Sequence, residues 1–207
     1  MRVYIKASKQ EESVELENDL NDMIGAIEEG ARRTSNIVKS LQLFSRKDTE
    51  NYIKSDIISG LESTFTLLSN KLCNGICLEK HFEKSEMVVS CFPGQLNQVF
   101  MNIMLNAIQA IEEEGEIKVE VKEQNDNVVI SISDSGQGIP NDRKDLIFEP
   151  FYTTKSVDEG TGLGLSITSE IIKKHKGSIE VENNTPKGTK FIIFLPKKVD
   201  DLVGSII

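Results

Sequence analysis

The chain has 207 residues, and its 24 Lys and Arg against 33 Asp and Glu give a formal net charge of −9 at pH 7. This acidic balance argues against a nucleic-acid-binding domain, which is usually basic or carries a basic stripe. No apolar run approaches the roughly 18 residues that a membrane-spanning helix needs, and the N-terminus lacks the apolar core of a secretion signal.

From about Glu11 to Lys47 the pattern is that of one long helix. Mainly apolar residues recur at steps of three and four, as in a coiled coil or helical bundle: Leu16, Leu20, Met23, Ile27, Ala31, Thr34, Val38 and Leu41. A helix of about 35 residues would be roughly 50 Å long, too long for one small domain to cover. We therefore expect this stripe to pack on a helix from a second chain.

Strands and helices are mixed in the rest of the chain. Short runs with β-propensity or period-two alternation predict strands: residues 51–54, 76–82, 87–91, 116–122, 127–133, 178–182 and 190–195. Apolar residues at helical spacing predict three helices: residues 56–72 after an N-cap at Ser55, residues 95–113 opened by Pro93-Gly94, and residues 165–175. The strands cluster in antiparallel pairs, so the predicted fold is α+β, a two-layer α/β sandwich with helices on one face of one sheet.

Three cysteines without a signal peptide fit a reducing cytoplasm. Cys73, Cys77 and His81 recur at steps of four, a spacing that admits a metal site. A closed zinc site needs four ligands, however, and no fourth stands nearby. We interpret the cysteines as ordinary structural residues.

The first candidate site is Asp134-Ser135-Gly136-Gln137-Gly138-Ile139, which follows a predicted strand. Its alternating glycines let the backbone turn sharply and admit a flat ligand. An ionised Asp only accepts hydrogen bonds, so it suits an exocyclic amine such as that of adenine. Taken alone, the motif is more typical of a plain turn.

The second candidate runs from Gly160 through Thr161, Gly162, Leu163 and Gly164 to Leu165 and opens a predicted helix. Free backbone N–H groups and the dipole at a helix N-terminus favour an anion. The motif lacks the lysine of a P-loop, and no strand leads into it as in a dinucleotide fingerprint. The alternative is a flexible linker.

The third candidate is the pair Asn102 and Asn106, which share one face of the apolar helix. Buried amides must be hydrogen-bonded or bind a ligand, and an amide oxygen is a suitable ligand for magnesium. The alternative is that both amides are satisfied by local backbone.

The three motifs together resemble the nucleotide-binding domain of two-component sensor histidine kinases, in the fold family shared with gyrase, Hsp90 and MutL. The resemblance covers about residues 30–196 and follows that family's order of motifs: an asparagine box (Gln98, Asn102, Asn106), a first glycine box (134–139), a phenylalanine box (148–155), a second glycine box (160–165) and Gly188-Thr189. Residues 106–110 and 152–155 are similar to the nitrogen-regulator-type branch.

The resemblance implies a Bergerat-type ATP-binding fold that uses ATP and Mg²⁺. It implies that Asp134 accepts from the adenine amine, with Gly136, Gly138 and Ile139 beside the ring and Thr189 at the adenine end. It implies that Asn106 coordinates Mg²⁺ and that Asn102 contacts the phosphates or the metal shell. The backbone of residues 160–165 would bind the triphosphate within a mobile lid formed by residues 141–164.

One departure concerns the basic contact to phosphate. Many family members carry Lys or Arg three residues after the second Asn, where this chain has Gln109. Lys155 or another basic residue must then supply the charge. Lys155 is our candidate for the γ-phosphate, with a solvated surface lysine as the alternative.

A second departure concerns the phosphorylated histidine. Residues 31–46 resemble the second helix of the family's dimerisation and phosphotransfer hairpin, whose first helix carries that histidine. This chain has only His81, in a predicted strand, and His175, at a helix C-terminus where a cation favours the dipole. Neither fits as the acceptor, so we expect a fragment that starts downstream of the histidine box.

The predicted organisation is a partial dimerisation segment (1–48), an ATP-binding catalytic domain (49–198) and a tail (199–207). The predicted function is transfer of the ATP γ-phosphate to a His absent from this chain, for relay to the receiver domain of a response regulator. The fragment alone should be inactive as an autokinase and should form a weak homodimer through its first helix. We expect it in the cytoplasm, whether or not the parent protein is attached to a membrane. The alternatives are a gyrase- or Hsp90-type ATP hydrolase and a non-enzymatic nucleotide-binding dimerisation module.

Overall fold

The computed structural model describes residues 20–21, 23–25, 27–28, 31, 52–73, 75–155 and 161–198. The first of these residues are helical, and the side chains of Leu20, Met23 and Ile27 are 58%, 63% and 71% exposed. The rest of the predicted N-terminal helix and the tail lie outside the described residues. In the part of the chain that the structure describes, no helix combines the length and the apolar character needed to cross a bilayer.

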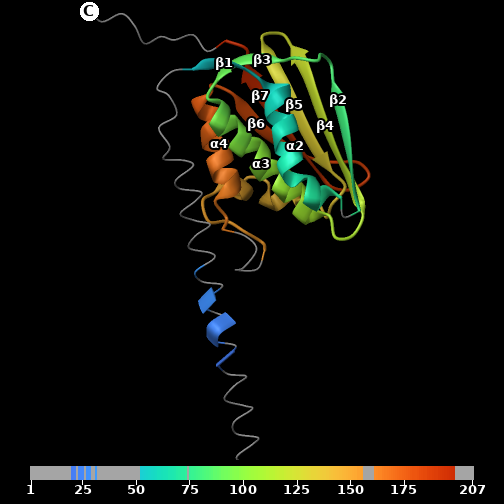
Figure 1. Ribbon diagram of the computed structural model, residues 1–207, viewed down its shortest axis with the longest axis vertical. Helices are drawn as coiled ribbons and strands as arrows, with labels where there is room; N and C mark the ends of the chain where they lie inside the picture. The colour runs from blue at the N-terminus through green and yellow to red at the C-terminus, as the bar shows by residue number, and fades with distance from the viewer. Residues whose placement is uncertain are drawn as a thin grey trace, which may run out of the picture.

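The described residues from 52 onward form three α-helices, seven strands and two short 3₁₀ turns (Figure 1). The helices are α2 (Ile57–Leu72), α3 (Pro93–Ala110) and α4 (Gly164–Lys174). The strands are β1 (Ile53–Asp56), β2 (Ile76–Phe82), β3 (Val88–Cys91), β4 (Gly115–Gln124), β5 (Asn127–Asp134), β6 (Ser178–Asn183) and β7 (Thr189–Pro196). The 3₁₀ turns are η1 (Asn141–Arg143) and η2 (Leu146–Phe148).

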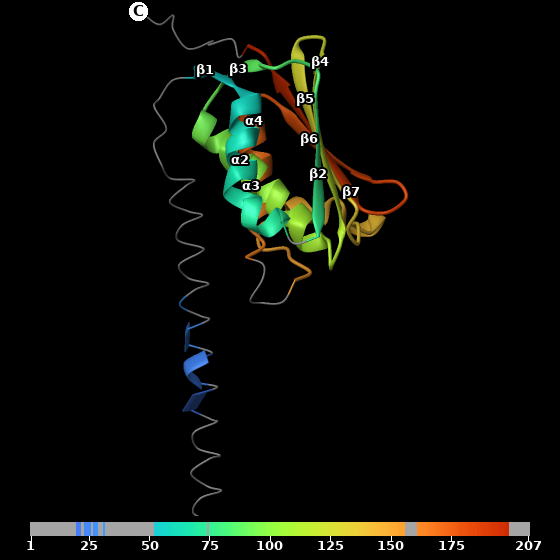
Figure 2. The same cartoon turned by 45° about the vertical axis from the view of Figure 1, so that its right-hand side comes forward.

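Helices α2, α3 and α4 cover one face of a five-stranded sheet, which confirms the α+β two-layer prediction (Figure 2). Between the layers, fully buried helix residues such as Leu61, Phe100 and Ile103 belong to the same core as Ile130 and Ile193 of the sheet. Burial of each such side chain contributes about 1.5–3 kcal/mol. This core holds α3 and α4 in place, and both helices line the cavity described below.

The sheet has the strand order β2-β4-β5-β7-β6. The predicted arrangement of antiparallel pairs in one sheet is wrong in two respects: β2 runs parallel to β4, and β1 pairs with β3 in a separate two-stranded sheet. The chain passes through β3 and α3 between β2 and β4, and such a crossover allows parallel pairing. The alternation of residues within a strand does not indicate which distant strand it pairs with or in which direction that strand runs.

Two predicted helix boundaries are also wrong. Helix α2 is capped by Asp56 rather than Ser55, because the Asp56 carboxylate accepts from the N–H groups of Ile58 at 3.1 Å and Ser59 at 3.0 Å. Helix α3 ends at Ala110 rather than near Glu113. The Ala110 carbonyl accepts from the N–H of Gln137 at 3.0 Å, so a contact remote in sequence fixes the end of this helix.

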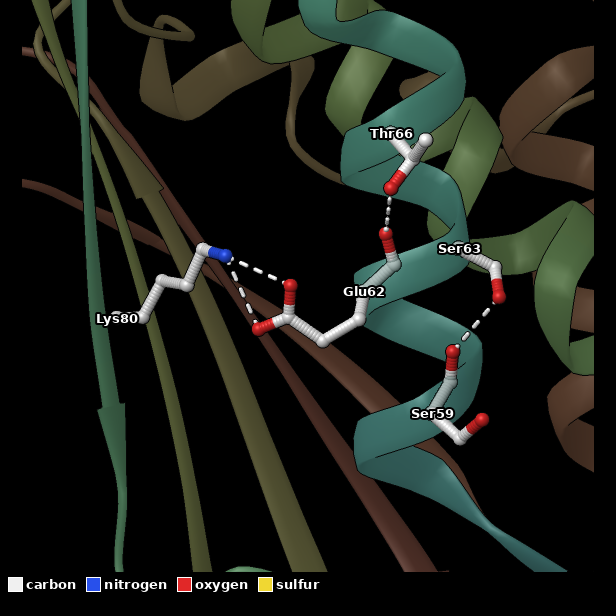
Figure 3. Close-up of polar contacts among 5 residues, drawn as sticks. All are labelled: Ser59, Glu62, Ser63, Thr66 and Lys80. Carbon is white, nitrogen blue, oxygen red and sulfur yellow. Dashed lines mark hydrogen bonds and ion pairs between the residues drawn. The ribbon is translucent and has the colours of Figure 1, made fainter.

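A polar contact joins α2 to the edge strand β2 (Figure 3). Lys80 Nζ donates to both carboxylate oxygens of Glu62, at 3.0 and 2.7 Å, and lies 4.8 Å from the centre of the Phe65 ring. Both charged side chains are partly exposed, so the pair contributes at most about 1 kcal/mol.

Candidate functional site

A cavity of about 670 Å³ lies among α3, the start of α4, the end of β5 and the loops around them, a size typical of small-molecule sites. It brings together most of the predicted site residues: Asn102, Asn106, Asp134, Gly138, Ile139, Lys155, Thr161, Gly162, Gly164, Leu165 and Thr189. Segments that are more than 80 residues apart in sequence therefore contribute to one site.

Asp134 is the last residue of β5, and only 3% of it is exposed. Its Oδ1 accepts from the N–H groups of Gly136 at 2.9 Å and Thr189 at 3.2 Å. Both bonds use the same oxygen, so among the described residues Oδ2 is the atom that can accept from a ligand. Burial raises the pKa of the Asp134 carboxyl above its ordinary value of 3.8, and the two backbone bonds partly oppose this rise.

Asn102 and Asn106 of α3 both line the cavity but have different contacts. Asn102 donates from Nδ2 to the carbonyl of Gly164 at 2.9 Å and to Oγ1 of Thr168 at 3.3 Å. Its amide nitrogen thus fastens α3 to the first turn of α4. Asn106 instead accepts at Oδ1 from Lys155 Nζ at 3.2 Å, and the same ammonium contacts Oε1 of Gln109.

Helix α4 begins at Gly164, as the second glycine box predicts to within one residue. Its first-turn N–H groups have no intrahelical acceptor, and Gly164 and Leu165 both line the cavity. Gly162, just before the helix, has φ of +66° and accepts at its carbonyl from the N–H of Phe151 at 2.9 Å. A helix N-terminus in this place can hold an anion.

Two described residues of the predicted site, Gly136 and Leu163, do not line the cavity. Gly136 lies against the end of α3, where an added Cβ would come within 2.6 Å of the Ala110 side chain. Leu163 packs against the core, and its carbonyl accepts from the N–H of Ile167 at 3.0 Å. Gly160 lies outside the described residues. The missing side chain of Gly136 thus serves the packing of the loop on α3.

Other cavity residues escaped the sequence reasoning, among them Arg143, Ile147 and Phe191. Phe191 had a usable signal, because it lies two positions after Thr189 on β7 and so shares its face of the sheet. Arg143 lies in the turn η1, where no periodicity points to a cavity. Arg143 is thus a second basic residue of the cavity lining, in addition to Lys155.

The donor set of α3 fits a hard cation. Asn106 lines the cavity, and its Oδ1 already accepts a hydrogen bond from the ammonium group of Lys155. Amide oxygen is among the ligands that magnesium accepts, alongside waters and phosphate oxygens. Among the described residues no group of three or more His, Cys, Asp or Glu could hold a metal ion by itself.

Both histidines lie away from the cavity lining. His81 is exposed on β2, 3.3 Å from Glu79. His175 is 1% exposed, and its Nε2 accepts from the N–H of Phe92 at 3.0 Å, while Nδ1 lies 2.7 Å from the carbonyl of Ile171. The basic residues in the last turn of α4 are Lys173 and Lys174, whereas the His175 ring accepts from the start of α3.

Residues 92–199 match the family of histidine kinase-, DNA gyrase B-, and HSP90-like ATPases. Sporulation kinase C of Bacillus subtilis (strain 168) is 32% identical over 184 residues, which cover 88% of this chain and 42% of that protein. This chain thus spans less than half of that relative.

Solved structures agree with this match. The catalytic domain of histidine kinase ThkA is 33% identical with a TM-score of 0.67, over 71% of this chain and 96% of that domain. ThkA in complex with response regulator protein TrrA is 29% identical with a TM-score of 0.67, over 81% of this chain and 48% of that one. Because the family match covers more than half of the 207 residues and the ThkA domain is matched almost throughout, this chain belongs to the histidine kinase-, DNA gyrase B-, and HSP90-like ATPases, as the ATP-binding catalytic region of a sensor histidine kinase.

Proposed function

We propose that this chain binds ATP with Mg²⁺ in the cavity between α3 and α4 and presents the γ-phosphate to a histidine outside this chain. The observation that carries the proposal is the arrangement of the cavity. A buried carboxylate lies at the end of β5, amide oxygens lie on α3, and the N-terminus of an 11-residue helix lies beside them. These groups suit the amine, the metal and the phosphates of one nucleotide.

Asp134 would accept from the exocyclic amine of adenine through Oδ2. Thr189 and Gly138 line the same cavity, and the N–H of Thr189 holds the carboxylate in position through Oδ1. The first turn of α4, at Gly164 and Leu165, would offer N–H groups to the phosphates. Asn102 keeps that turn against α3 by donating to the Gly164 carbonyl, so its role is to position the phosphate-binding turn.

Asn106 would supply the protein ligand to magnesium. The ion, when bound, would neutralise part of the charge on the phosphates. The support for this assignment is that Asn106 lines the cavity and that its Oδ1 accepts from a cationic group. Lys155, the candidate for a basic contact to the γ-phosphate, donates to this same oxygen when no metal is bound.

Phosphotransfer is favoured over hydrolysis by the absence of a general base. A hydrolase of the gyrase or Hsp90 type needs a carboxylate that activates water. The sequence of α3 contains no Asp or Glu, and Asp134 is the only carboxylate among the described residues that line the cavity. Asp134 lies at the adenine end in this proposal, far from the γ-phosphate.

The acceptor histidine would come from outside this chain. His175 lies at the C-terminal end of α4, roughly 16 Å along an 11-residue helix from the turn proposed to hold the phosphates. His175 is also buried with both ring nitrogens in contact with backbone, and His81 is on β2. By itself this chain should therefore bind ATP without labelling itself.

The proposed partners are a second copy of the chain and a response regulator. The exposed apolar side chains of Leu20, Met23 and Ile27 support pairing through the N-terminal helix. The dimer would be weak, because this segment resembles only the second helix of the family's dimerisation hairpin. The structure of ThkA with a response regulator supports the second partner. We place the chain in the cytoplasm, where ATP and the reducing conditions suited to its free cysteines occur.

Titration calorimetry with ATP, with and without Mg²⁺, tests this proposal, followed by incubation with γ-labelled ATP. The purified chain should bind ATP, release phosphate slowly and gain no acid-labile label, whereas a longer kinase chain that carries its histidine should be labelled in trans. Asn106→Ala should weaken binding of Mg·ATP far more than binding of metal-free ADP. Absence of ATP binding, or stable label on His81 or His175, would overturn the proposal.

A further inference from the structure

Lys155 lies against two amide oxygens of α3. Its Nζ donates to Oδ1 of Asn106 at 3.2 Å and, in a closer contact, to Oε1 of Gln109. Asn106 and Gln109 are three residues apart on α3 and share one face of the helix. Lys155 is 49 and 46 residues away from them in sequence, so the tertiary structure alone creates this contact.

Both oxygens are of the type that binds hard cations. A neutral amide oxygen is a common ligand of magnesium, and it is also a good acceptor for the compact ammonium group of lysine. Lys155 and a magnesium ion at Asn106 would therefore use the same atom.

The two cations cannot share that atom at low cost, because like charges this close repel strongly in a partly buried site. Lys155 is only partly buried, and its contact with Gln109 is exposed to solvent, so the ammonium can move into water. We propose that Lys155 competes with magnesium for the amide oxygen of Asn106, and that Gln109 is the positioning residue that holds Lys155 there. This inference rests on the proposed function, because it needs a nucleotide in the cavity.

If the two cations compete, Lys155 contributes differently to the affinity for metal-free ATP and to the affinity for Mg·ATP. With metal-free ATP the ammonium stays at Asn106 and supplies the positive charge beside the phosphates. With Mg·ATP the ion supplies that charge, and Lys155 is displaced. Loss of Lys155 should therefore weaken the metal-free complex more than the magnesium complex.

The experiment measures the dissociation constant of ATP by titration calorimetry on the 207-residue chain, once in excess Mg²⁺ and once in EDTA. In Lys155→Met the metal-free affinity should fall about tenfold, as expected for loss of a charge-assisted hydrogen bond, and the Mg·ATP affinity should change by less than about threefold. The ratio of the dissociation constant in EDTA to that in excess Mg²⁺ should therefore rise. Gln109→Leu, which keeps the lysine but removes its holding oxygen, should raise the same ratio by a smaller factor.

Arg143→Met is the matched control, because Arg143 also lines the cavity and is basic but, among the described residues, does not hydrogen-bond to Asn106 or Gln109. It should leave the ratio unchanged even if it weakens both complexes. Equal losses with and without Mg²⁺ in Lys155→Met would make Lys155 a general phosphate contact and overturn the competition. An unchanged ratio in Gln109→Leu would overturn the positioning role. If the wild-type chain binds no ATP in either buffer, the proposed function itself fails, an outcome distinct from the other two.

Discussion

The backbone N–H of Phe92 donates a hydrogen bond to Nε2 of His175, across 83 residues of sequence. Phe92 is the N-cap of α3 and His175 is the C-cap of α4, so this bond joins opposite ends of the two helices that line the cavity. The rings of Tyr52 and Phe92 pack with centroids 4.4 Å apart, and the Tyr52 hydroxyl donates to the carbonyl of Lys174 at 2.7 Å. Tyr52, just before β1, thus packs against the start of α3 and the end of α4.

The first prediction concerns this bond. His175→Ala leaves the buried N–H of Phe92 without an acceptor and opens a cavity, so we expect a loss of about 2–4 kcal/mol in the free energy of unfolding. His175→Gln, whose amide oxygen can accept from the same N–H, should lose clearly less. Urea unfolding followed by circular dichroism measures both. Equal stability of the alanine variant and the wild type would show that the bond contributes nothing.

The second prediction concerns the adenine contact. Asp134→Asn retains an Oδ1 that can accept from Gly136 and Thr189, but it replaces Oδ2 by an amide that donates. We expect ATP affinity to fall roughly ten- to a hundredfold, because an unmatched polar group costs ~1–3 kcal/mol. The melting temperature without ATP should not fall, because the variant no longer buries an ionised carboxylate. Unchanged affinity in calorimetry would remove Asp134 from the adenine site.

The third prediction follows from the raised pKa of Asp134. Between the ordinary value of 3.8 and the raised value, the folded protein binds more protons than the unfolded chain, so the contribution of Asp134 to stability falls as the pH rises through this window. In the proposed site the ionised Oδ2 would accept from adenine above the window, whereas a proton would compete for that oxygen below it. ATP affinity should therefore decline as the pH falls into the window. In Asp134→Asn this decline should be absent, and a decline of the same size in the variant would assign it to another group.

The fourth prediction compares two glycines of the second glycine box. In Gly162→Ala the new Cβ would lie 2.6 Å from the carbonyl oxygen of Phe151, in a backbone with φ of +66°. We expect a loss of at least about 2 kcal/mol in stability. In Gly164→Ala the nearest atom would be 3.7 Å away, on Asn102, and the residue is helical, so stability should be kept or slightly raised. Thermal melting of both variants makes the comparison, and equal losses would contradict it.

The fifth prediction concerns the thiols. Cys73 and Cys77 are exposed, whereas Cys91 is buried on β3, where desolvation raises the pKa of its thiol to about 11. A thiol reacts as thiolate, so Cys91 should be inert at pH 8. Titration of the native protein with Ellman's reagent should release two equivalents rapidly, and the third should appear only in denaturant. Three rapid equivalents would show that β3 opens readily.

Local patterns in the sequence were sufficient to predict the helices and strands to within a few residues, because periodicity reflects which side of an element is buried. They were also sufficient to place Asn102, Asn106 and Asp134 in motifs that resemble one kinase family. Asn106 and Asp134 lie on different elements, yet the order of the motifs already suggested a common site.

Only the tertiary structure decided which distant groups meet. The parallel pairing of β2 with β4, the bond from Phe92 to His175, and the contact of Lys155 with Asn106 and Gln109 join residues that are tens of positions apart. No pattern within one element records such contacts, because they depend on how the buried faces of all elements pack together. For the same reason His175, which the sequence places only at the end of a helix, is a buried ring that accepts from the N–H of Phe92 in the fold.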